Sequence, residues 1–322
     1  MGVRPSSPPP SQSNPCLLNV FRSKLRLGHY RHCRITQSPE ELLSSIRKFA
    51  ALAYLLTWVL LGPWFYAYTV VYAGHPPRWL WFLAPLAFIG GWGPSIAGFV
   101  VASRTEGRSG VRRLLVSLCA WRAPPRWYVV VFLVPPLATA LSLVVVDRGT
   151  DTLQHFAFGP AIRHLPLAYA LALPFGPLGE EVGWRGFALP RLLARFGPWR
   201  ATVALGVLWT FWHGPMMLFM PGASIPSFMG LSVTSVLIFL VQITSETALM
   251  TLLYLQTRGS LFMAVLAHLT FNTAESVVFS GLPSMALDLQ QSVYLVNVGV
   301  LSVLGLAGLL WVTRRPSASP AV

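Results

Sequence analysis

Two adjacent glutamates, Glu180 and Glu181, close the apolar stretch LPLAYALALPFGPLG, and Arg185 follows them in the run GEEVGWRGFALP. An ionisable group at the end of such a stretch costs free energy unless a partner compensates it, so it most often serves a function. Arg185 lies four residues after Glu181. This spacing allows an ion pair if a helix continues between the two residues.

Three more polar residues occur in apolar stretches further along the chain: His213 in LWTFWHGP, and His268 and Asn272 in AHLTFNTAES. Hydrolysis of an acyl bond needs a base that activates water, a group that shares the water, and donors that stabilise the oxyanion. Glu180 suits the base, and His213 suits the second contact to the water. His268 and Asn272 are four residues apart, so on a helix both could donate to one carbonyl oxygen.

Other hydrolytic chemistries fit the sequence less well. It contains no GxSxG or HExxH motif and no aspartate inside an apolar stretch, which argues against a serine triad, an HExxH zinc site and an aspartyl dyad. Glu180, His213 and His268 do form a two-histidine, one-carboxylate set that would bind zinc if their helices converged. The residues by themselves therefore leave a zinc cofactor open.

Membrane helices must position these residues. The 322 residues are 54% hydrophobic, include only 10 Asp and Glu, and have a mean hydropathy of +0.58. A helix needs roughly 20 apolar residues to cross a bilayer, and on this basis we predict an all-α, polytopic membrane bundle of about eight transmembrane helices. The approximate spans are 50–72, 80–102, 127–146, 165–182, 201–220, 229–255, 261–280 and 293–312.

The net charge of +14 is explained by membrane topology rather than by nucleic-acid binding. With eight spans and both termini cytoplasmic, 21 of the 24 Lys and Arg fall in cytoplasmic segments, which leaves Arg78, Arg148 and Arg163 outside. This asymmetry agrees with the positive-inside rule, and no basic and aromatic surface module is visible outside the spans. We therefore predict an integral protein of the cell membrane, with its active site toward the cytoplasmic side and no nucleic-acid partner.

Composition divides the chain into three parts. Residues 1–48 form a basic cytoplasmic tail that we expect to be disordered, residues 49–315 form the membrane domain, and residues 316–322 form a second disordered tail. No apolar h-region precedes residue 49, so we expect no cleavable signal peptide. The three cysteines provide neither a disulfide framework nor a CxxC metal pair.

The polar residues follow the motifs of a known family. The chain resembles the CAAX protease and bacteriocin-processing family of intramembrane endopeptidases, which includes the Ras-converting CAAX prenyl endopeptidase and has the motifs EExxxR, FxxxH and HxxxN. The matching residues, in order, are Glu180, Glu181 and Arg185, then Trp209 and His213, then His268 and Asn272. Trp209 stands where the family has Phe, a change that keeps an aromatic wall but alters its shape. The resemblance covers about residues 80–280.

The resemblance implies a role for each of these positions. Glu180 and His213 would activate water, and His268 and Asn272 would form the oxyanion hole. Glu181 and Arg185 would shape the site or contact the substrate. The substrate would be a membrane-associated peptide or protein, either prenylated or of a bacteriocin or signalling type. Members are often named metalloproteases, although a glutamate mechanism needs no metal, so we expect no metal cofactor and keep zinc as the alternative. The sequence leaves the oligomeric state unknown.

The same residues allow two other classes of function. Intramembrane carboxylates, including Glu246 and Glu275, which match no motif, could carry protons in a transporter. Some members of the family protect their host from a peptide toxin by binding it. Structural explanations also exist, because His213 could be a packed histidine, and His268 and Asn272 could form hydrogen bonds between helices.

Overall fold

The computed structural model describes residues 38–147, 158–220, 224–226, 229–281 and 287–314. Within these ranges every regular element is a helix, which confirms the predicted all-α class. Residues 1–37 of the predicted N-terminal tail and the whole predicted tail 316–322 lie outside the described residues.

The helices, among which η1 and η4 are π-helices and η2 is a 3₁₀-helix, are α1 (Pro39–Leu60), α2 (Gly62–Tyr66), η1 (Ala67–Val71), η2 (Arg78–Leu83), α3 (Ala84–Gly91), α4 (Gly93–Leu118), α5 (Pro125–Val146), α6 (Phe158–Phe175), α7 (Pro177–Glu181), η4 (Val182–Ala188), α8 (Leu189–Trp212), α9 (Gly214–Phe219), α10 (Val233–Gln256), α11 (Leu261–Gly281) and α12 (Leu287–Arg314).

The first helix begins inside the segment that composition assigned to the tail. Ser38 caps α1: its Oγ accepts a hydrogen bond from the backbone N–H of Glu41 at 3.3 Å, and the Glu41 carboxylate accepts one from the N–H of Ser38 at 2.7 Å. Pro39, at the first helical position, has a backbone angle that suits a helix start. Residues 39–48 are therefore helical, because this local capping signal outweighs their polar composition.

Four helical segments of the described residues are long and apolar enough to cross a membrane: Pro39–Val71, Pro125–Val146, Val233–Gln256 and Asp288–Arg314. A fifth is added if Arg78–Gly91 and Gly93–Leu118, which meet at a bend of 54°, form one span. These segments identify an integral membrane protein. Of the other predicted spans, 165–182 overlaps α6 and α7, 201–220 overlaps α8 and α9, and 261–280 coincides with α11. The count of eight crossings stays a prediction.

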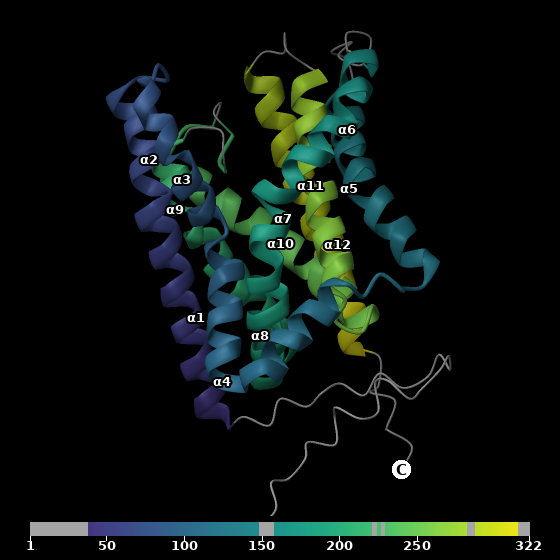
Figure 1. Cartoon of the computed structure of the whole chain (residues 1–322). Helices are drawn as coiled ribbons and strands as arrows, with labels where there is room; N and C mark the ends of the chain where they lie inside the picture. The colour runs from purple at the N-terminus through teal and green to yellow at the C-terminus, as the bar shows by residue number, and fades with distance from the viewer. Residues whose placement is uncertain (1–37, 148–157, 221–223, 227–228, 282–286, 315–322) are drawn as a thin grey trace, which may run out of the picture. The chain divides into compact units, whose positions relative to one another are not determined.

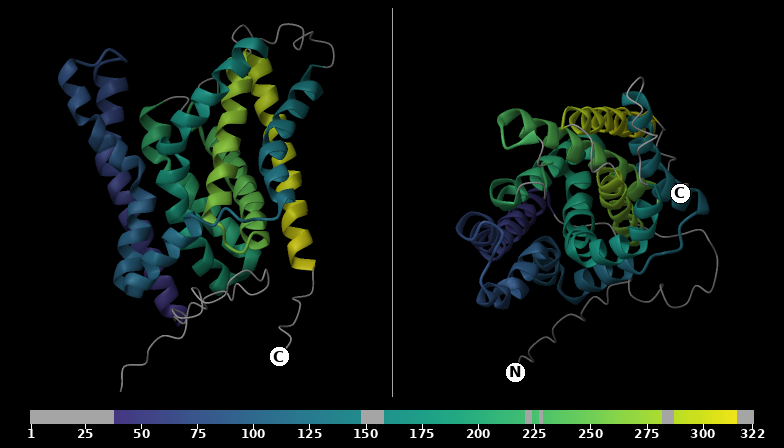
Figure 2. Two further views of the ribbon diagram at one scale, coloured as in Figure 1. Left: turned by 45° about the vertical axis from the view of Figure 1, so that its right-hand side comes forward. Right: turned by 90° about the horizontal axis from the view of Figure 1, so that it is seen from above.

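The segment that carries the glutamates lies inside the helix bundle. In Figure 1, α1 and α4 are on the left, α5 and α12 on the right, and α7, α8 and α10 between them. Helix α7 contacts α4, α6 and α11, and η4 contacts α4, α8 and α11. The start of α1 and the end of α12 lie at the same end of the bundle (Figure 2). Elements distant in sequence thus surround residues 177–188.

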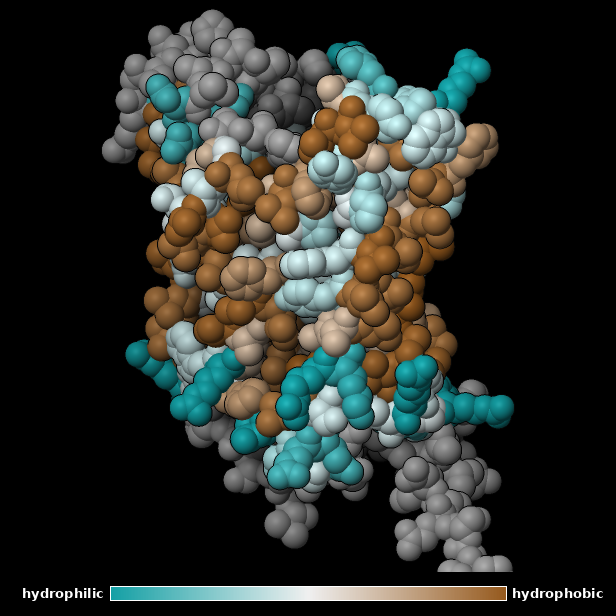
Figure 3. Space-filling model, turned by 90° about the vertical axis from the view of Figure 1, so that its left-hand side faces the viewer, coloured by the Kyte–Doolittle hydropathy of each residue, from teal (hydrophilic) through white to brown (hydrophobic). Residues whose placement is uncertain are grey.

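Hydrophobic side chains cover much of the middle of one face of the bundle (Figure 3). Figure 3 shows the face on the left of Figure 1, where apolar residues form a broad band and strongly hydrophilic residues gather below it, at the end where α1 begins. Such a band flanked by polar residues is the surface expected of helices in contact with lipid.

Helix α4 and the π-helix η4 meet backbone to backbone. A Cβ added to Gly183 would lie 2.2 Å from the carbonyl oxygen of Pro94, so only glycine permits this approach. Phe49 of α1 contacts the rings of Trp184 and Phe187, with centroid distances of 5.3 and 5.2 Å. The glycine contact and the aromatic contacts together fix η4 against α4 and α1.

Candidate active site

The glutamates lie where an α-helix changes into a π-helix. Pro177 opens α7 directly after Gly176, α7 ends at Glu181, and η4 continues from there to Ala188. Single turns of π-helix are rare and frequently mark functional sites. Both glutamates and all seven residues of η4 are buried. The carboxylates therefore face the protein interior.

Glu180 has a hydrogen-bond donor from the second motif. The Nε1–H of Trp209 on α8 donates to Oε2 of Glu180 over 2.6 Å, and Glu180 is only 6% exposed. A hydrogen bond to a carboxylate is about twice as strong as one between neutral groups. This contact joins the first motif to the second.

Glu181 joins the first motif to the third. Nη1 of Arg185 lies 2.8 Å from Oε1 of Glu181, and both side chains are completely buried, so the ion pair that the spacing allows does form. Nδ1 of His268 on α11 lies 2.8 Å from the same oxygen. Nη2 of Arg185 also donates to Oγ1 of Thr247 on α10, over 3.2 Å. Glu181 and Arg185 thereby connect α7 and η4 to α10 and α11.

The contacts of the two histidines define which ring nitrogen is free. Nδ1 of His213 lies 2.8 Å from the carbonyl oxygen of Trp209, which can only accept, so Nδ1 carries the hydrogen and Nε2 keeps its lone pair. The ring lies between Trp212 and Phe239, at centroid distances of 4.8 and 5.3 Å. Nδ1 of His268 donates to Glu181 in the same way, which leaves its Nε2 as the nitrogen available to another group.

Asn272 and Glu180 border a common point beside Gly176. A Cβ added to Gly176 would lie 3.4 Å from Nδ2 of Asn272 and 3.7 Å from Oε1 of Glu180. Unlike the other motif side chains, that of Asn272 is exposed. The residues predicted as the base and as part of the oxyanion hole thus both lie within 4 Å of a position where the chain has no side chain.

The zinc alternative requires Glu180, His213 and His268 to converge on one ion. Among the described residues, no three His, Cys, Asp or Glu side chains are gathered closely enough to hold a metal. Nδ1 of each histidine has a protein partner, which leaves Nε2 as the nitrogen that a metal would bind.

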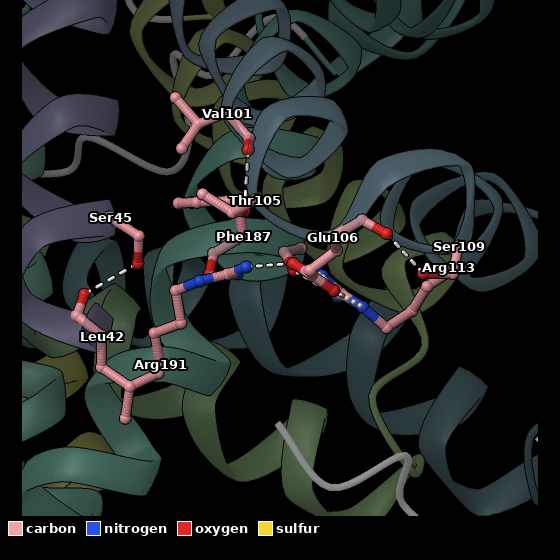
Figure 4. Close-up of polar contacts among 10 residues, drawn as sticks. Leu42, Ser45, Val101, Thr105, Glu106, Ser109, Arg113, Phe187 and Arg191 are labelled. Atoms are coloured by element: carbon pink, nitrogen blue, oxygen red, sulfur yellow. Dashed lines mark hydrogen bonds and ion pairs between the residues drawn. The ribbon is translucent and has the colours of Figure 1, made fainter. Parts of the chain in front are cut away.

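A second ion cluster supports η4 from α4 (Figure 4). Nη2 of Arg113 lies 3.1 Å from both carboxylate oxygens of Glu106, and Arg191 donates to the same carboxylate. Nη1 of Arg113 donates to the carbonyl oxygen of Gly186 at 3.1 Å, and Nη1 of Arg191 to that of Phe187 at 2.8 Å. Burial lowers the pKa of Arg191 to about 10, and the nearby Glu106 carboxylate opposes that shift. Sequence reasoning did not identify this cluster.

The two glutamates outside the motifs lie in one cluster. Nε2 of Gln242 donates to Oε1 of Glu246 at 3.0 Å and to Oε1 of Glu275 at 2.7 Å. The hydroxyl of Tyr294 donates to Oε1 of Gln242 at 2.5 Å, and Nδ2 of Asn297 lies 3.5 Å from Glu275. These contacts join α10, α11 and α12, and they give Glu246 and Glu275 a structural role in linking helices.

Comparison with known proteins matches the part of the chain that carries the three motifs. Residues 162–274, which include all three motifs, match the family model described as type II CAAX prenyl endopeptidase Rce1-like. This segment is therefore similar to that family of endopeptidases. Over 186 residues the chain is 25% identical to CAAX prenyl protease 2 of Methanococcus maripaludis, an alignment that covers 56% of this chain. The same alignment covers 64% of the length of that relative.

Proposed function

We propose that the chain is an intramembrane endopeptidase that hydrolyses a peptide bond in a membrane-associated peptide or protein. The observation that carries the proposal is that Oε1 of Glu180 and Nδ2 of Asn272, from two separate motifs, border the same point beside Gly176. The family match and the name of the Methanococcus maripaludis relative support the same class of reaction.

In the proposed mechanism, Oε1 of Glu180 takes a proton from a water molecule that also contacts Nε2 of His213. The water oxygen bonds to the carbonyl carbon, and the carbonyl oxygen gains negative charge. Nδ2–H of Asn272 and Nε2–H of His268 stabilise that charge. The proton held by Glu180 then passes to the amide nitrogen as the carbon–nitrogen bond breaks, which yields an acid and an amine.

Glu181 and Arg185 act through His268 in this mechanism. The hydrogen bond from Nδ1 to Glu181 fixes the orientation of the imidazole ring, as a carboxylate does for the histidine of a serine protease. To donate from Nε2 as well, the ring must carry both protons, and Glu181 then supplies a compensating negative charge. Arg185 balances the charge of Glu181 and holds it in place through the 2.8 Å ion pair.

The substrate class follows from the membrane setting of the site. The name of the relative, CAAX prenyl protease 2, makes a prenylated C-terminal peptide one candidate, and a bacteriocin-type or signalling peptide is the other. We further propose a mechanism without a metal cofactor, because Glu180 and His213 can activate water on their own. The alternatives, a proton-coupled transporter and a toxin-binding immunity protein, predict no peptide cleavage.

For topology we propose eight crossings of the cell membrane, both termini in the cytoplasm and an active site toward the cytoplasmic side. The excess of Lys and Arg in the predicted cytoplasmic segments supports this orientation. The common end at which α1 begins and α12 finishes supports an even number of crossings. Substrates would then enter from the membrane or from the cytoplasm.

Loss of the proposed base or of its partner should abolish cleavage. Purified protein in detergent should cleave a membrane-anchored peptide, and Glu180→Gln or His213→Ala should lower kcat/KM by about 10²- to 10⁴-fold, the usual contribution of a positioned acid or base. Glu246→Gln, which alters a buried carboxylate outside the motifs, is the matched control and should keep most of the activity. Full cleavage by Glu180→Gln would contradict the proposed mechanism. If the unaltered protein carries protons across the membrane and cleaves no peptide, the transporter alternative is favoured.

A methyl group beside Gly176 should block the reaction without unfolding the protein. Gly176→Ala places a carbon at ordinary contact distances, 3.4 Å from Asn272 and 3.7 Å from Glu180, in the space that the water and the peptide carbonyl need. We expect kcat/KM to fall about 100-fold, because misplacement by about 1 Å has such an effect, with little change in melting temperature. Gly299→Ala on α12, where an added Cβ meets nothing within 4 Å, is the control. Equal activity of the two variants would show that the water and the peptide carbonyl do not occupy the space beside Gly176.

Removal of metal should leave the enzyme active. After treatment with a chelator, elemental analysis should find far less than one zinc per chain in protein that still cleaves the peptide, since Glu180 serves as the base. If the chelator abolishes cleavage and only zinc restores it, the proposal of a metal-free mechanism is wrong.

Reporter fusions test the topology. Alkaline phosphatase, which is active only outside the cytoplasm, should be inactive when fused after Arg258 or at the C-terminus and active when fused after Arg148. The opposite pattern would place the site on the other side of the membrane.

A further inference from the structure

Trp209 differs from the Phe of the motif in ring size and in carrying a hydrogen-bond donor. The family pattern has Phe at this position, whose ring carries no hydrogen-bond donor, whereas the indole of Trp209 carries one. That donor is directed at the carboxylate of Glu180, over 2.6 Å. Trp209 is 1% exposed and Glu180 is 6% exposed, so the bond is shielded from solvent.

The geometry points to Trp209 as a positioning residue that selects which oxygen of Glu180 faces the water. This inference rests on the proposed function, because it assigns Trp209 a role only if Glu180 is the base. The indole N–H occupies Oε2. The other oxygen, Oε1, borders the point beside Gly176 that Asn272 also borders. A carboxylate without this donor could rotate and present either oxygen, or neither, to the water.

The surroundings of Trp209 keep its N–H in place. The guanidinium carbon of Arg185 lies 4.2 Å from the centre of the indole ring, a cation–π contact. The ring of His268 meets the indole edge to face at 5.1 Å, and the carbonyl oxygen of Trp209 accepts the hydrogen bond from Nδ1 of His213. Trp209 therefore contacts residues of all three motifs. A Phe would keep an aromatic ring at this place, but it would lose the bond to Glu180 together with part of the buried ring volume.

A matched pair of substitutions isolates the donor. Trp212 lies on the same helix, is 2% exposed, and donates its Nε1–H to Oγ1 of Thr57 at 2.8 Å instead of to a motif residue. Trp209→Phe and Trp212→Phe thus remove the same group from similar surroundings. We expect Trp209→Phe to lower kcat about 10- to 100-fold, the rate equivalent of one hydrogen bond to a charged group, with KM unchanged. Trp212→Phe keeps an aromatic ring against His213 and removes no donor from a motif residue, so it should lower kcat far less than Trp209→Phe does.

A spectroscopic readout tests the bond independently of activity. In protein with ¹⁵N-labelled tryptophan, each indole N–H gives its own NMR peak, and the peak missing from Trp209→Phe belongs to Trp209. Glu180→Gln replaces the charged acceptor by a neutral one, so this peak should move upfield while the Trp212 peak stays. If Trp209→Phe does not fold, the spectrum of Trp212→Phe identifies the Trp212 peak by its absence. The test is then whether Glu180→Gln moves any of the remaining indole peaks. The absence of such a shift overturns the inference.

The outcomes separate this inference from the proposed function. An inactive Glu180→Gln variant together with a normal kcat for Trp209→Phe would overturn the role of Trp209 and leave the proposed function intact. Normal cleavage by Glu180→Gln would overturn the proposed function and, with it, the role of Trp209. A fall in kcat that is equal in Trp209→Phe and Trp212→Phe would also overturn the inference, because it would indicate a general packing effect.

Discussion

A negative charge buried among apolar helices must be compensated at close range, and this constraint governs the centre of the bundle. Glu181 meets it with Arg185 and His268, which both contact one carboxylate oxygen at 2.8 Å. Removal of one partner from a buried pair costs roughly 3–5 kcal/mol. The chain must therefore hold α7, η4 and α11 where this pairing is complete. Because Glu180 directly precedes Glu181 in α7, the contacts of Glu181 also fix the backbone position of Glu180.

Helix α4 is the support against which the glutamate segment is held. Gly183 lets η4 approach Pro94 closely, and the Glu106 cluster reaches across to the end of the π-helix. Arg113 and Arg191 provide side-chain donors to carbonyl groups in a stretch where the regular α-helical pattern of hydrogen bonds is interrupted. Backbone packing against Pro94 thereby stabilises this buried, irregular turn. The charged side chains of Arg113 on α4 and Arg191 on α8 stabilise it further.

Much of this site follows from the sequence, because local spacing carries the information. Apolar stretches predict helices, and the four-residue separation predicts the contact of Glu181 with Arg185. The polar residues inside apolar stretches stand out because burying a polar group costs free energy. The direction of the Trp209 indole, the contact of His268 with Glu181 and the cluster around Glu106 could not be predicted. They depend on how distant helices meet, and the sequence signal for Glu106 is only a single carboxylate within the basic run SRTEGRSGVRR.

The exposed side chain of Asn272 differs from the buried groups around it. An amide open to its surroundings stabilises an oxyanion weakly, since competing molecules reduce the strength of its hydrogen bonds. A peptide that enters the site would cover this amide and exclude those competitors. In the proposed mechanism the substrate would therefore complete its own oxyanion hole, because the amide of Asn272 would be shielded only while a peptide is bound.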